Sequence, residues 1–415
     1  MITIIKNIAE IVQVEHQAKK WVAGKDMAHI ETIKNGFIEI TNGLISNFGS
    51  MENWKGIENW NNTEIIDAEG GMVFPSYCDS HSHIVFHSNR ENEWVQRIKG
   101  ASYTEIAQNG GGILNSAKKL QSASETELIH SALNRVNEVV KMGTGALEIK
   151  SGYGLTIDAE IKMLRIIKAI KEKTDLSIKS TFLGAHAIPK LFNGNSSKYL
   201  DHIIEDMLPI IAQEKLADYI DIFCEQGYFT VQDTERLLIA AKHHGLVPKT
   251  HVNQFSILGG VRKSVELGAL SVDHLELIND DDIDALAGSE CMPTMLPGCS
   301  FFLGIPYGPA RQLIDQGLPL ALASDFNPGS CPSGNMNLVA SLGCIKMNMT
   351  PEEVINATTI NTAYAMGLSH EIGSIAKGKK ANLFITKPMS SHAYLAYSFG
   401  SHTIDKQILN GKIQS

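Results

Sequence analysis

The chain has 415 residues, a formal net charge of −9, and 43% hydrophobic and 20% charged residues. This composition is typical of a globular protein with room for one large domain and a smaller one. The negative charge and the lack of a basic cluster argue against a nucleic acid partner and leave a small polar or anionic substrate open.

The N-terminus and the cysteines indicate a cytoplasmic protein. Residues Met1–Lys6 have no sustained apolar core and no small-residue cleavage site, so we expect no signal peptide. No apolar stretch is long enough to span a membrane, so we expect no membrane partner. The six cysteines are scattered without a C-x-x-C pair, unlike a disulfide framework or a thiolate zinc site.

Residues 1–68 are expected to be rich in β-strands. Short apolar runs at Ile30–Ile33 and Gly36–Ile40 flank Lys34-Asn35, and Glu64–Asp67 is expected to form another strand. No helical period runs through the later part of this region. We therefore expect residues 1–68 to form the N-terminal part of a β domain.

Short apolar runs alternate with amphipathic segments over residues 69–366. Eight strands are predicted: Met72–Tyr77, Gly145–Ile149, Ser177–Gly184, Tyr219–Cys224, Val247–His251, Ser271–His274, Cys291–Leu296 and Pro319–Ala323. The helices predicted between them include Glu125–Met142, Asp158–Glu172, Lys198–Ala212, Gln232–His244 and Ser256–Leu267. Eight such units in roughly 250 residues predict an α/β fold, a (β/α)8 barrel. An open doubly wound sheet is the alternative, but polar residues recur at the C-terminal strand ends, where barrel active sites lie.

The helical pattern stops past Gly367. Strands are predicted at Ile372–Ile375 and Ala381–Thr386, and Lys406–Ile413 is predicted to be a hairpin with an Asn410-Gly411 turn. Because chain termini are often close in space, we expect residues 367–415 to join residues 1–68 in one small β domain beside the barrel.

Four candidate metal ligands follow predicted barrel strands. His81 and His83 come after the first strand with a spacing that puts both imidazoles on one face. The fifth strand ends at His251 and the eighth is followed by Asp325. Each residue alone is more often structural, but three imidazoles and a carboxylate at one barrel mouth suit a divalent ion such as Zn²⁺.

Two further histidines, His186 and His274, lie at the ends of the third and sixth strands. A neutral imidazole at such a place can act in electrostatic stabilisation or proton transfer. The simpler alternatives are a hydrogen bond to a ligand for His274 and an ordinary loop position for His186.

With these residues placed, the chain resembles the imidazolonepropionase family of the amidohydrolase superfamily over nearly its whole length. The resemblance rests on Asp79–Phe86, Asn89-Arg90, Gly110–Ile113, Glu148–Leu155, Thr181–His186 and Ala323–Ser330. The His-x-His pair marks only the superfamily, whereas Glu148–Gly154 and Asp325–Ser330 are much more specific. The resemblance implies a cytoplasmic enzyme of histidine degradation, a homodimer, with a barrel beside a β-sandwich made from both chain ends.

The resemblance also implies roles for individual residues. It implies His81, His83, His251 and Asp325 as the ligands of one zinc or iron ion. It implies substrate contacts from seven residues: Arg90, Tyr153, His186, Gln254, Asn327, Gly329 and Ser330. Binuclear relatives carry a carboxylated lysine at the end of the fourth strand. That strand here is followed by Glu225 and not by a lysine, while Lys150 follows another strand, so we expect one ion with Glu225 outside its ligand set.

The implied reaction is hydrolytic opening of 4-imidazolone-5-propanoate to N-formimidoyl-L-glutamate. A metal ion lowers the pKa of its bound water from 15.7 to about 7 and so supplies hydroxide. Asp325 is expected to shuttle the water's proton to the leaving ring nitrogen, and His274 to stabilise the oxyanion. Arg90 suits the propionate because its planar fork matches a carboxylate, the alternative being a surface ion pair with Glu91 or Glu93.

The chain departs from the family pattern at several positions. Ser80 and Ser82 stand where proline and threonine are common, and Cys331 replaces a common hydroxyl residue. Gln254 stands where an acid can occur; an amide cannot act as a base, so we expect Gln254 only to hydrogen-bond the substrate.

Two other functions are compatible with parts of this pattern. A mononuclear deaminase of a purine or pyrimidine ring would use the same ligands, but typically with a carboxylic acid near the fifth-strand histidine, where this chain has Gln254. A catalytically silent barrel acting as a binding protein would predict lost ligands, and all four are present.

Overall fold

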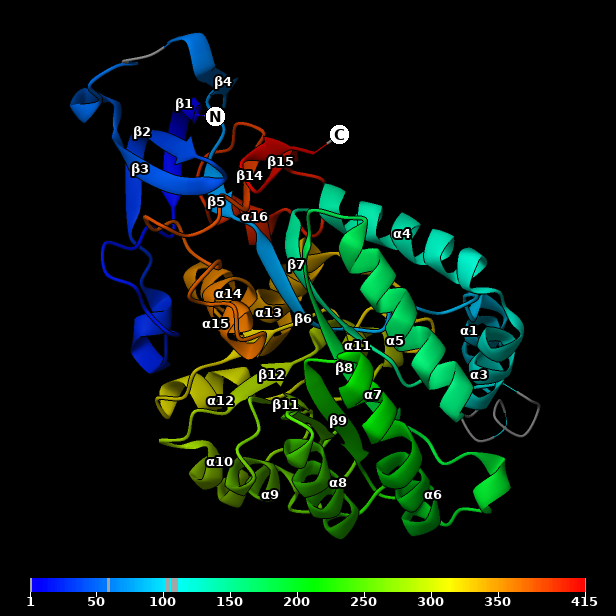
Figure 1. The fold of residues 1–415 in the computed structure, drawn as a ribbon. Coiled ribbons are helices and arrows are strands. Elements are labelled where there is room, and N and C mark those ends of the chain that lie inside the picture. The colour runs from blue at the N-terminus through cyan, green and yellow to red at the C-terminus, as the bar shows by residue number, and fades with distance from the viewer. Residues whose placement is uncertain (1, 58–59, 102–104, 106–110, 415) are drawn as a thin grey trace.

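The structure is a computed structural model that describes residues 2–57, 60–101, 105 and 111–414. Its strands form two sheets of eight strands each. One sheet contains both ends of the chain and lies at the top of Figure 1, and the other forms the barrel below it.

The terminal sheet has the strand order β16-β15-β14-β5-β1-β2-β3, with β4 also paired to β1. Its strands are β1 (Ile2–Val12), β2 (Thr32–Thr41), β3 (Leu44–Ser50), β4 (Thr63–Asp67), β5 (Val73–Pro75), β14 (Leu383–Thr386), β15 (Ile404–Leu409) and β16 (Lys412–Ile413). Residues from both chain ends share its buried core, among them Ile5, Ile38, Leu383 and Ile408. The prediction that the two ends form one β domain is confirmed.

Local geometry in this sheet differs from the prediction at two places. Lys34-Asn35 does not separate two strands but lies inside β2, where Asn35 adopts a positive φ of 47°. Ile372–Ile375 forms no strand; it contributes one isolated bridge, between Val14 and Ile375. The predicted hairpin is present, and Asn410 and Gly411 take the positive φ values that a tight turn requires.

The barrel strands follow one another in chain order, and each pairs in parallel with the next. They are β6 (Tyr77–Ser82), β7 (Thr144–Lys150), β8 (Ser177–Ala185), β9 (Tyr219–Cys224), β10 (Val247–Val252), β11 (Ser271–His274), β12 (Met292–Met295) and β13 (Ala321–Leu322). The last and first strands approach where Asp325 N donates to His81 O at 2.9 Å and His83 N donates to Phe326 O at 2.8 Å. This near-closed parallel barrel confirms the predicted fold class.

The first barrel strand is not where the sequence predicted it. The apolar run Met72–Tyr77 divides between the two sheets, because Ser76 N bonds to Asn382 O of the terminal part and Tyr77 N bonds to Gly143 O beside the barrel. Strand β6 therefore runs on to Ser82, and His81 lies within it rather than beyond its end.

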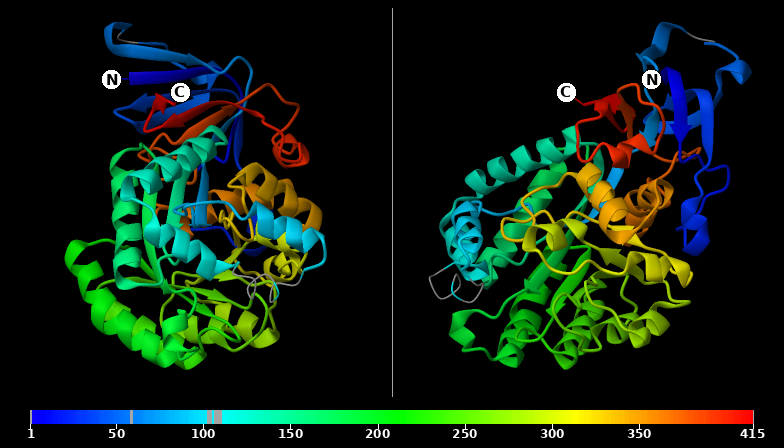
Figure 2. Two further views of the ribbon diagram at one scale, coloured as in Figure 1. Left: turned by 90° about the vertical axis from the view of Figure 1, so that its right-hand side faces the viewer. Right: turned by 180° about the vertical axis from the view of Figure 1, so that it is seen from behind.

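The helices surround the barrel, as the two further views in Figure 2 show. They are α1 (Glu91–Ile98), α3 (Ile113–Ser122), α4 (Glu125–Lys141), α5 (Ile157–Glu172), α6 (Ser196–His202), α7 (Leu208–Glu214), α8 (Val231–His243), α9 (Gly260–Glu266), α10 (Asp280–Leu286), α11 (Pro297–Leu303), α12 (Ala310–Asp315), α13 (Met336–Met347), α14 (Pro351–Thr358), α15 (Ile360–Ala365) and α16 (Tyr394–Tyr397). The predicted helix Lys198–Ala212 is interrupted by a π-helical turn at Ile203–Met207.

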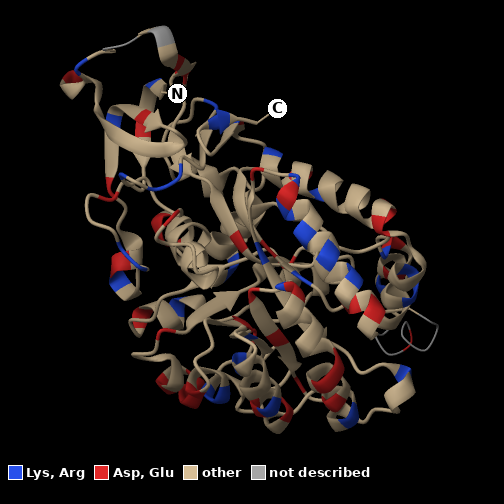
Figure 3. Cartoon of the chain, viewed as in Figure 1, with Lys and Arg blue, Asp and Glu red and all other residues tan. Residues whose placement is uncertain are grey.

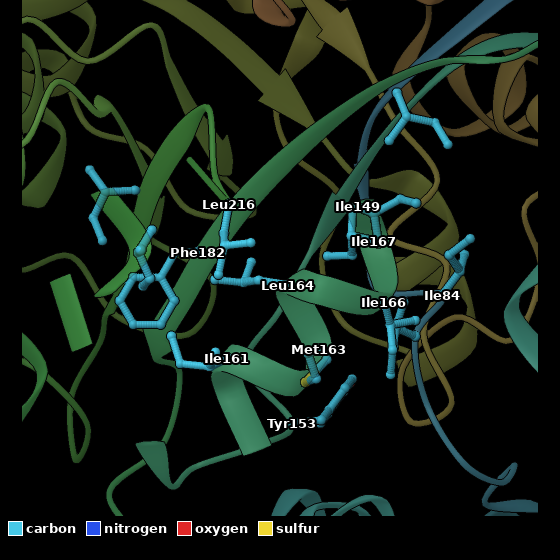
Figure 4. Packing of buried hydrophobic residues seen from close by; sticks show 14 of the residues in the cluster. Ile84, Ile149, Tyr153, Ile161, Met163, Leu164, Ile166, Ile167, Phe182 and Leu216 are labelled. Atoms are coloured by element: carbon cyan, nitrogen blue, oxygen red, sulfur yellow. The ribbon is translucent and has the colours of Figure 1, made fainter. Parts of the chain in front are cut away.

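The helices cover the barrel with apolar faces and turn charged faces outward. In Figure 4, Ile167 of α5 lies beside Ile149 of β7 and Leu164 of α5 lies beside Leu216, and all four residues are buried. Acidic and basic residues are interspersed over the outer helices in Figure 3. Within the part of the chain that the structure describes, no helix is long and apolar enough to cross a membrane.

Candidate active site

A cavity of about 910 Å³ lies at the C-terminal mouth of the barrel. Eleven of the twelve residues predicted for the site line it: His83, Arg90, Tyr153, His186, His251, Gln254, His274, Asp325, Asn327, Gly329 and Ser330. The twelfth, His81, is fully buried, and its ring centroid lies 4.4 Å from that of His251. The structure thus brings all twelve residues to one place, while their roles stay predictions.

The candidate ligand atoms of β6 and of the segment after β13 converge. The Nε2 atoms of His81 and His83 are 3.3 Å apart, and each lies 3.6 Å from Oδ1 of Asp325. Nε2 of His251 is buried and has no hydrogen-bond partner among the described residues. Nitrogen and oxygen donors that face one another, with an unpartnered imidazole nitrogen beside them, fit a bound divalent ion.

Two buried carboxylates orient these imidazoles. Oδ2 of Asp273 lies 2.7 Å from Nδ1 of His81, and Oδ2 of Asp221 lies 3.0 Å from Nδ1 of His251. At His81 the carboxylate accepts a hydrogen bond from Nδ1 and so leaves Nε2 free to bind a metal, whereas at His251 the carboxylate is close to Nδ1 without hydrogen-bond geometry. Asp221 also accepts the backbone N–H of His251 at 3.1 Å, which fixes the end of β10.

Beneath the histidines lies a fully buried ionic network. Lys150, the last residue of β7, contacts Glu148 at 2.7 Å, Asp221 at 2.8 Å and Asp273 at 3.5 Å, and Lys249 of β10 also bonds to Glu148. Burial would raise the pKa of Asp221, but His251 and Lys150 hold it well below its usual value. Asp221 therefore stays ionised and able to orient His251.

The imidazoles of His81 and His83 are held neutral. Burial, together with Lys150 and the neighbouring histidines, lowers the pKa of His81 well below its usual value. For His83 the main cause of the lowered pKa is again burial, and the charge interaction with His186 is the next largest. Metal ligation needs this neutral form.

His274 behaves in the opposite way. Burial alone would lower its pKa, but the carboxylates of Glu276, Asp325 and Asp273 together raise it. Nδ1 of His274 lies 3.2 Å from Oε1 of Glu276. The raised pKa favours the positively charged form of this ring, and a positive charge beside the cavity suits stabilisation of a developing oxyanion.

Both candidate catalytic residues have a strained backbone conformation. His274 has φ 90° and Asp325 has φ 55°, both in the region that disfavours residues other than glycine. The segment before Asp325 is held by Asp79, which accepts the N–H of Ser324 at 3.0 Å. Burial raises the pKa of Asp79 to about 7.

Arg90 lies across the cavity mouth at the start of α1. Its Nε donates to Oγ of Ser116 at 2.8 Å, and its buried Nη2 has no hydrogen-bond partner among the described residues. The guanidinium carbon lies 5.7 Å from the centre of the Tyr153 ring. No ion pair joins Arg90 to Glu91 or Glu93 in the described part of the chain, so its Nη2 is left for an anion.

The Asn327–Ser330 loop approaches Arg90 closely. Oδ1 of Asn327 accepts the backbone N–H groups of Gly329 and Ser330, each at 2.8 Å, and thereby shapes the turn. A Cβ atom on Gly329 would lie 2.4 Å from Nη1 of Arg90. Only glycine therefore leaves room for the arginine in this position.

The opposite wall carries hydrogen-bonding side chains. Nδ1 of His186 lies 3.1 Å from Gly152 O, and its ring stacks on that of His83 at 5.4 Å between centroids. Burial, with His251, lowers the pKa of His186 to about 3, so Nδ1 donates to the carbonyl and Nε2 is an acceptor. Nε2 of Gln254 donates to Sγ of Cys299 at 3.5 Å.

The carboxylate of Glu225 accepts hydrogen bonds from neighbouring residues of the chain. It accepts the backbone N–H groups of Gln226 at 2.8 Å and Phe255 at 2.9 Å, and the hydroxyl of Ser256. It thereby holds the segment that carries Gln254.

Gly110, the first residue of one family motif, lies outside the described residues; Gly112 precedes α3.

Sequence reasoning gave no role to the residues that support the site. None of the five has exposed surface: Glu148, Lys150, Asp221, Lys249 and Asp273. Glu148 and Lys150 belong to a family motif, and for the other three a charged residue inside an otherwise apolar strand was the signal in the sequence. The aromatic residues of the cavity wall were missed as well, since aromatic residues are ordinary core components: Trp94, Phe223, Tyr228, Phe255 and Phe302.

Comparisons with known proteins agree with this fold. Residues 72–414 match the model of the amidohydrolase family. An imidazolonepropionase from Flavobacterium johnsoniae and one from Christiangramia forsetii are each 57% identical to the chain over 413 residues, which cover 100% of both chains. An imidazolonepropionase from Alkaliphilus oremlandii is 41% identical over 410 residues, which cover 99% of this chain and 97% of the relative.

Solved structures of low sequence identity share the fold. A variant of the atrazine chlorohydrolase of Arthrobacter aurescens, complexed with zinc and atraton, has a TM-score of 0.74 at 13% identity and covers 99% of this chain and 94% of its own. The guanine deaminase of E. coli has a TM-score of 0.74 at 12% identity and covers 100% of this chain and 99% of its own. At these identities the similarity concerns the fold alone.

Proposed function

The chain belongs to the amidohydrolase family and, within it, to the imidazolonepropionases, and on this premise we propose that its cavity opens the ring of 4-imidazolone-5-propanoate to give N-formimidoyl-L-glutamate. The chain is thus a hydrolase of histidine degradation that acts on a small molecule. Hydrolysis breaks the bond between the ring carbonyl carbon and its nitrogen. Water oxygen joins the carbon, and a proton goes to the nitrogen.

We assign His81, His83, His251 and Asp325 as the residues that hold one metal ion. Three observations support this assignment: the donor atoms of His81, His83 and Asp325 lie within 3.6 Å of one another, Nε2 of His251 has no partner among the described residues, and the imidazoles of His81 and His83 are neutral. When bound, a divalent ion supplies Lewis-acid polarisation of a carbonyl and acidifies water at neutral pH. We propose zinc or iron as that ion.

Asp325 moves the proton. Burial raises the pKa of its carboxyl, so it can accept a proton from the attacking water and then release it to the ring nitrogen. Oδ2 of Asp325 accepts a hydrogen bond from Oγ of Ser330 at 3.2 Å, which orients the carboxylate. His274, held by Glu276, stabilises the oxyanion on the attacked carbonyl.

The substrate's propionate binds to Arg90. The buried Nη2 of Arg90 has no hydrogen-bond partner among the described residues. A carboxylate can accept two parallel hydrogen bonds from one edge of a guanidinium group. His186 presents an acceptor that suits a ring N–H group. Tyr153, Gln254, Asn327, Gly329 and Ser330 complete the contacts.

The observation that carries the substrate assignment is that one cavity is lined by candidate metal ligands and by Arg90, whose buried Nη2 has no hydrogen-bond partner among the described residues. A deaminase would call for a carboxylic acid near His251, and the chain has Gln254 there. We also propose a cytoplasmic homodimer.

The test is hydrolysis of freshly generated 4-imidazolone-5-propanoate by purified protein of known metal content. Loss of its ultraviolet absorption with formation of N-formimidoyl-L-glutamate is expected, together with loss of turnover on chelation and recovery when one ion per chain is restored. Turnover that survives complete metal removal would contradict the proposal, as would an inert metal-replete protein.

A further inference from the structure

Glu276 is a buried carboxylate with one oxygen unused. It follows β11, is only 4% exposed, and its Oε1 lies 3.2 Å from Nδ1 of His274. Its Oε2 is also buried and has no hydrogen-bond partner among the described residues. A buried carboxylate oxygen without a partner is costly, which indicates that a donor or a cation belongs beside it.

Cys299 of α11 supplies sulfur at the same place. One ligand atom each from His274, Glu276 and Cys299 lie within 4.8 Å of one another, and all three residues are buried. An imidazole nitrogen, a carboxylate oxygen and a thiolate together form a donor set that Zn²⁺ binds in proteins, and sulfur favours the softer ions. The site assigned above to the hydrolytic ion contains no sulfur, so the two donor sets differ in chemistry.

We propose that His274, Glu276 and Cys299 form a second cation site that takes a thiophilic divalent ion, Zn²⁺ or Cd²⁺, and that its occupation inhibits the enzyme. The cation reaches the site from the cavity, which His274 lines. Binding releases the thiol proton and the Nδ1 proton to solvent and gives Oε2 of Glu276 a positive partner.

The second ion should inhibit the enzyme because it binds His274 and Cys299, whose present contacts support the substrate cavity. This part rests on the proposed function, in which His274 stabilises the oxyanion. An ion at Nδ1 breaks the contact between His274 and Glu276, and an ion at Sγ removes the acceptor that Cys299 offers to Nε2 of Gln254. His274 and Gln254 line the substrate cavity, so a cation behind them disturbs catalysis and substrate binding together.

Cadmium is the probe, because a cadmium thiolate has an ultraviolet charge-transfer absorption that histidine and carboxylate ligands do not produce. Full-length protein that already holds one zinc ion per chain is titrated with Cd²⁺. We expect one further ion per chain by elemental analysis, and thiolate absorption that saturates at that ratio. Cys299→Ser should lose the absorption. Cys344→Ser should keep it, because Cys344, the one partly exposed cysteine, is the control for adventitious binding.

The Glu276→Gln variant distinguishes cadmium binding by all three residues from cadmium binding by the Cys299 thiol alone. The amide keeps the size of the side chain and removes its charge, so the dissociation constant for Cd²⁺ should rise by about tenfold or more. Circular dichroism and thermal unfolding check that each variant is folded. Absence of thiolate absorption in the unmodified protein, or absorption that persists in Cys299→Ser, would overturn the site.

Turnover of the same samples tests the inhibitory effect. Activity should fall in parallel with the absorption, and Cys299→Ser should be insensitive to cadmium at those concentrations. Absorption without a loss of turnover would overturn the inhibition. A protein that binds cadmium as described but never hydrolyses the proposed substrate would instead refute the proposed function, so the two failures are distinguishable.

Discussion

Nδ1 of His81 lies 2.7 Å from Oδ2 of Asp273, and neither side chain is exposed to solvent. The two residues come from β6 and β11, which are far apart in the strand order of the barrel. The contact fixes which imidazole nitrogen carries the proton and directs Nε2 toward His83 and Asp325. The geometry of the candidate metal site therefore depends on a carboxylate that is not assigned as a ligand.

Replacement of Asp273 should weaken metal binding without removing a ligand. Asp273→Asn removes the charge that orients His81, so we expect the affinity for the hydrolytic ion to fall by about 10- to 100-fold. Competition with a chromophoric chelator measures it. Asp405→Asn, an exposed change on β15, is the matched control, and an unchanged affinity in Asp273→Asn would contradict the assigned role.

Gly329→Ala should displace Arg90. The new Cβ would lie 2.4 Å from Nη1, so the guanidinium must move from its present position. Loss of a charged hydrogen bond to the propionate should raise KM by about tenfold or more, with a smaller change in kcat. Arg90→Lys, which keeps the charge but not the fork, should show the same pattern. A change confined to kcat would place the propionate elsewhere.

Ser116 should act on substrate binding through Arg90. Its Oγ accepts the Nε–H of Arg90 at 2.8 Å and leaves both Nη groups for a carboxylate. Ser116→Ala should raise KM several-fold, by about 1 kcal/mol in binding free energy, and leave kcat nearly unchanged. Ser116→Thr retains the hydroxyl and should restore KM; equal defects in both variants would indicate a packing effect instead.

Asp79 should make the stability of the metal-free protein depend on pH. Its pKa is raised from 3.8 to about 7 by burial, so the folded protein binds the proton more tightly than the unfolded chain. The stabilising contribution is therefore complete below the unfolded pKa and is lost as pH rises through about 7. Between about pH 5 and about pH 8 the loss should be about 3 kcal/mol.

Urea unfolding of metal-free protein at the two pH values measures this contribution. The asparagine in Asp79→Asn cannot titrate, and its amide oxygen can still accept the N–H of Ser324. Between the two pH values, the free energy of unfolding of the variant should therefore fall by about 3 kcal/mol less than that of the unmodified chain. Equal losses in the two proteins would show that Asp79 has an ordinary pKa.

The alternation of strands and helices was enough to predict the barrel and to place the candidate ligands at one end of it. The first strand was misplaced because its apolar signal, Val73–Pro75, belongs to the terminal sheet. The true strand carries Asp79, Ser80 and His81, whose buried polar side chains have no period-two apolar pattern.

The ionic network under the site could not be predicted for a different reason. Glu148 and Lys249 are about a hundred positions apart in the chain, and their contact exists only once the barrel has closed. Sequence spacing indicates which residues share a strand face, but it does not pair charges across the interior. The roles of Asp221 and Asp273 became visible only from their distances to His251 and His81.

The most direct test of the account is a single comparison of metal content and turnover in Asp325→Asn and the unmodified protein, with freshly generated 4-imidazolone-5-propanoate as substrate. Asparagine keeps the size and one oxygen donor of Asp325 but cannot accept the proton. We expect the variant to retain at least part of its metal and to lose turnover by a factor of about 10² to 10⁴. Full turnover in metal-loaded Asp325→Asn would contradict the central claim.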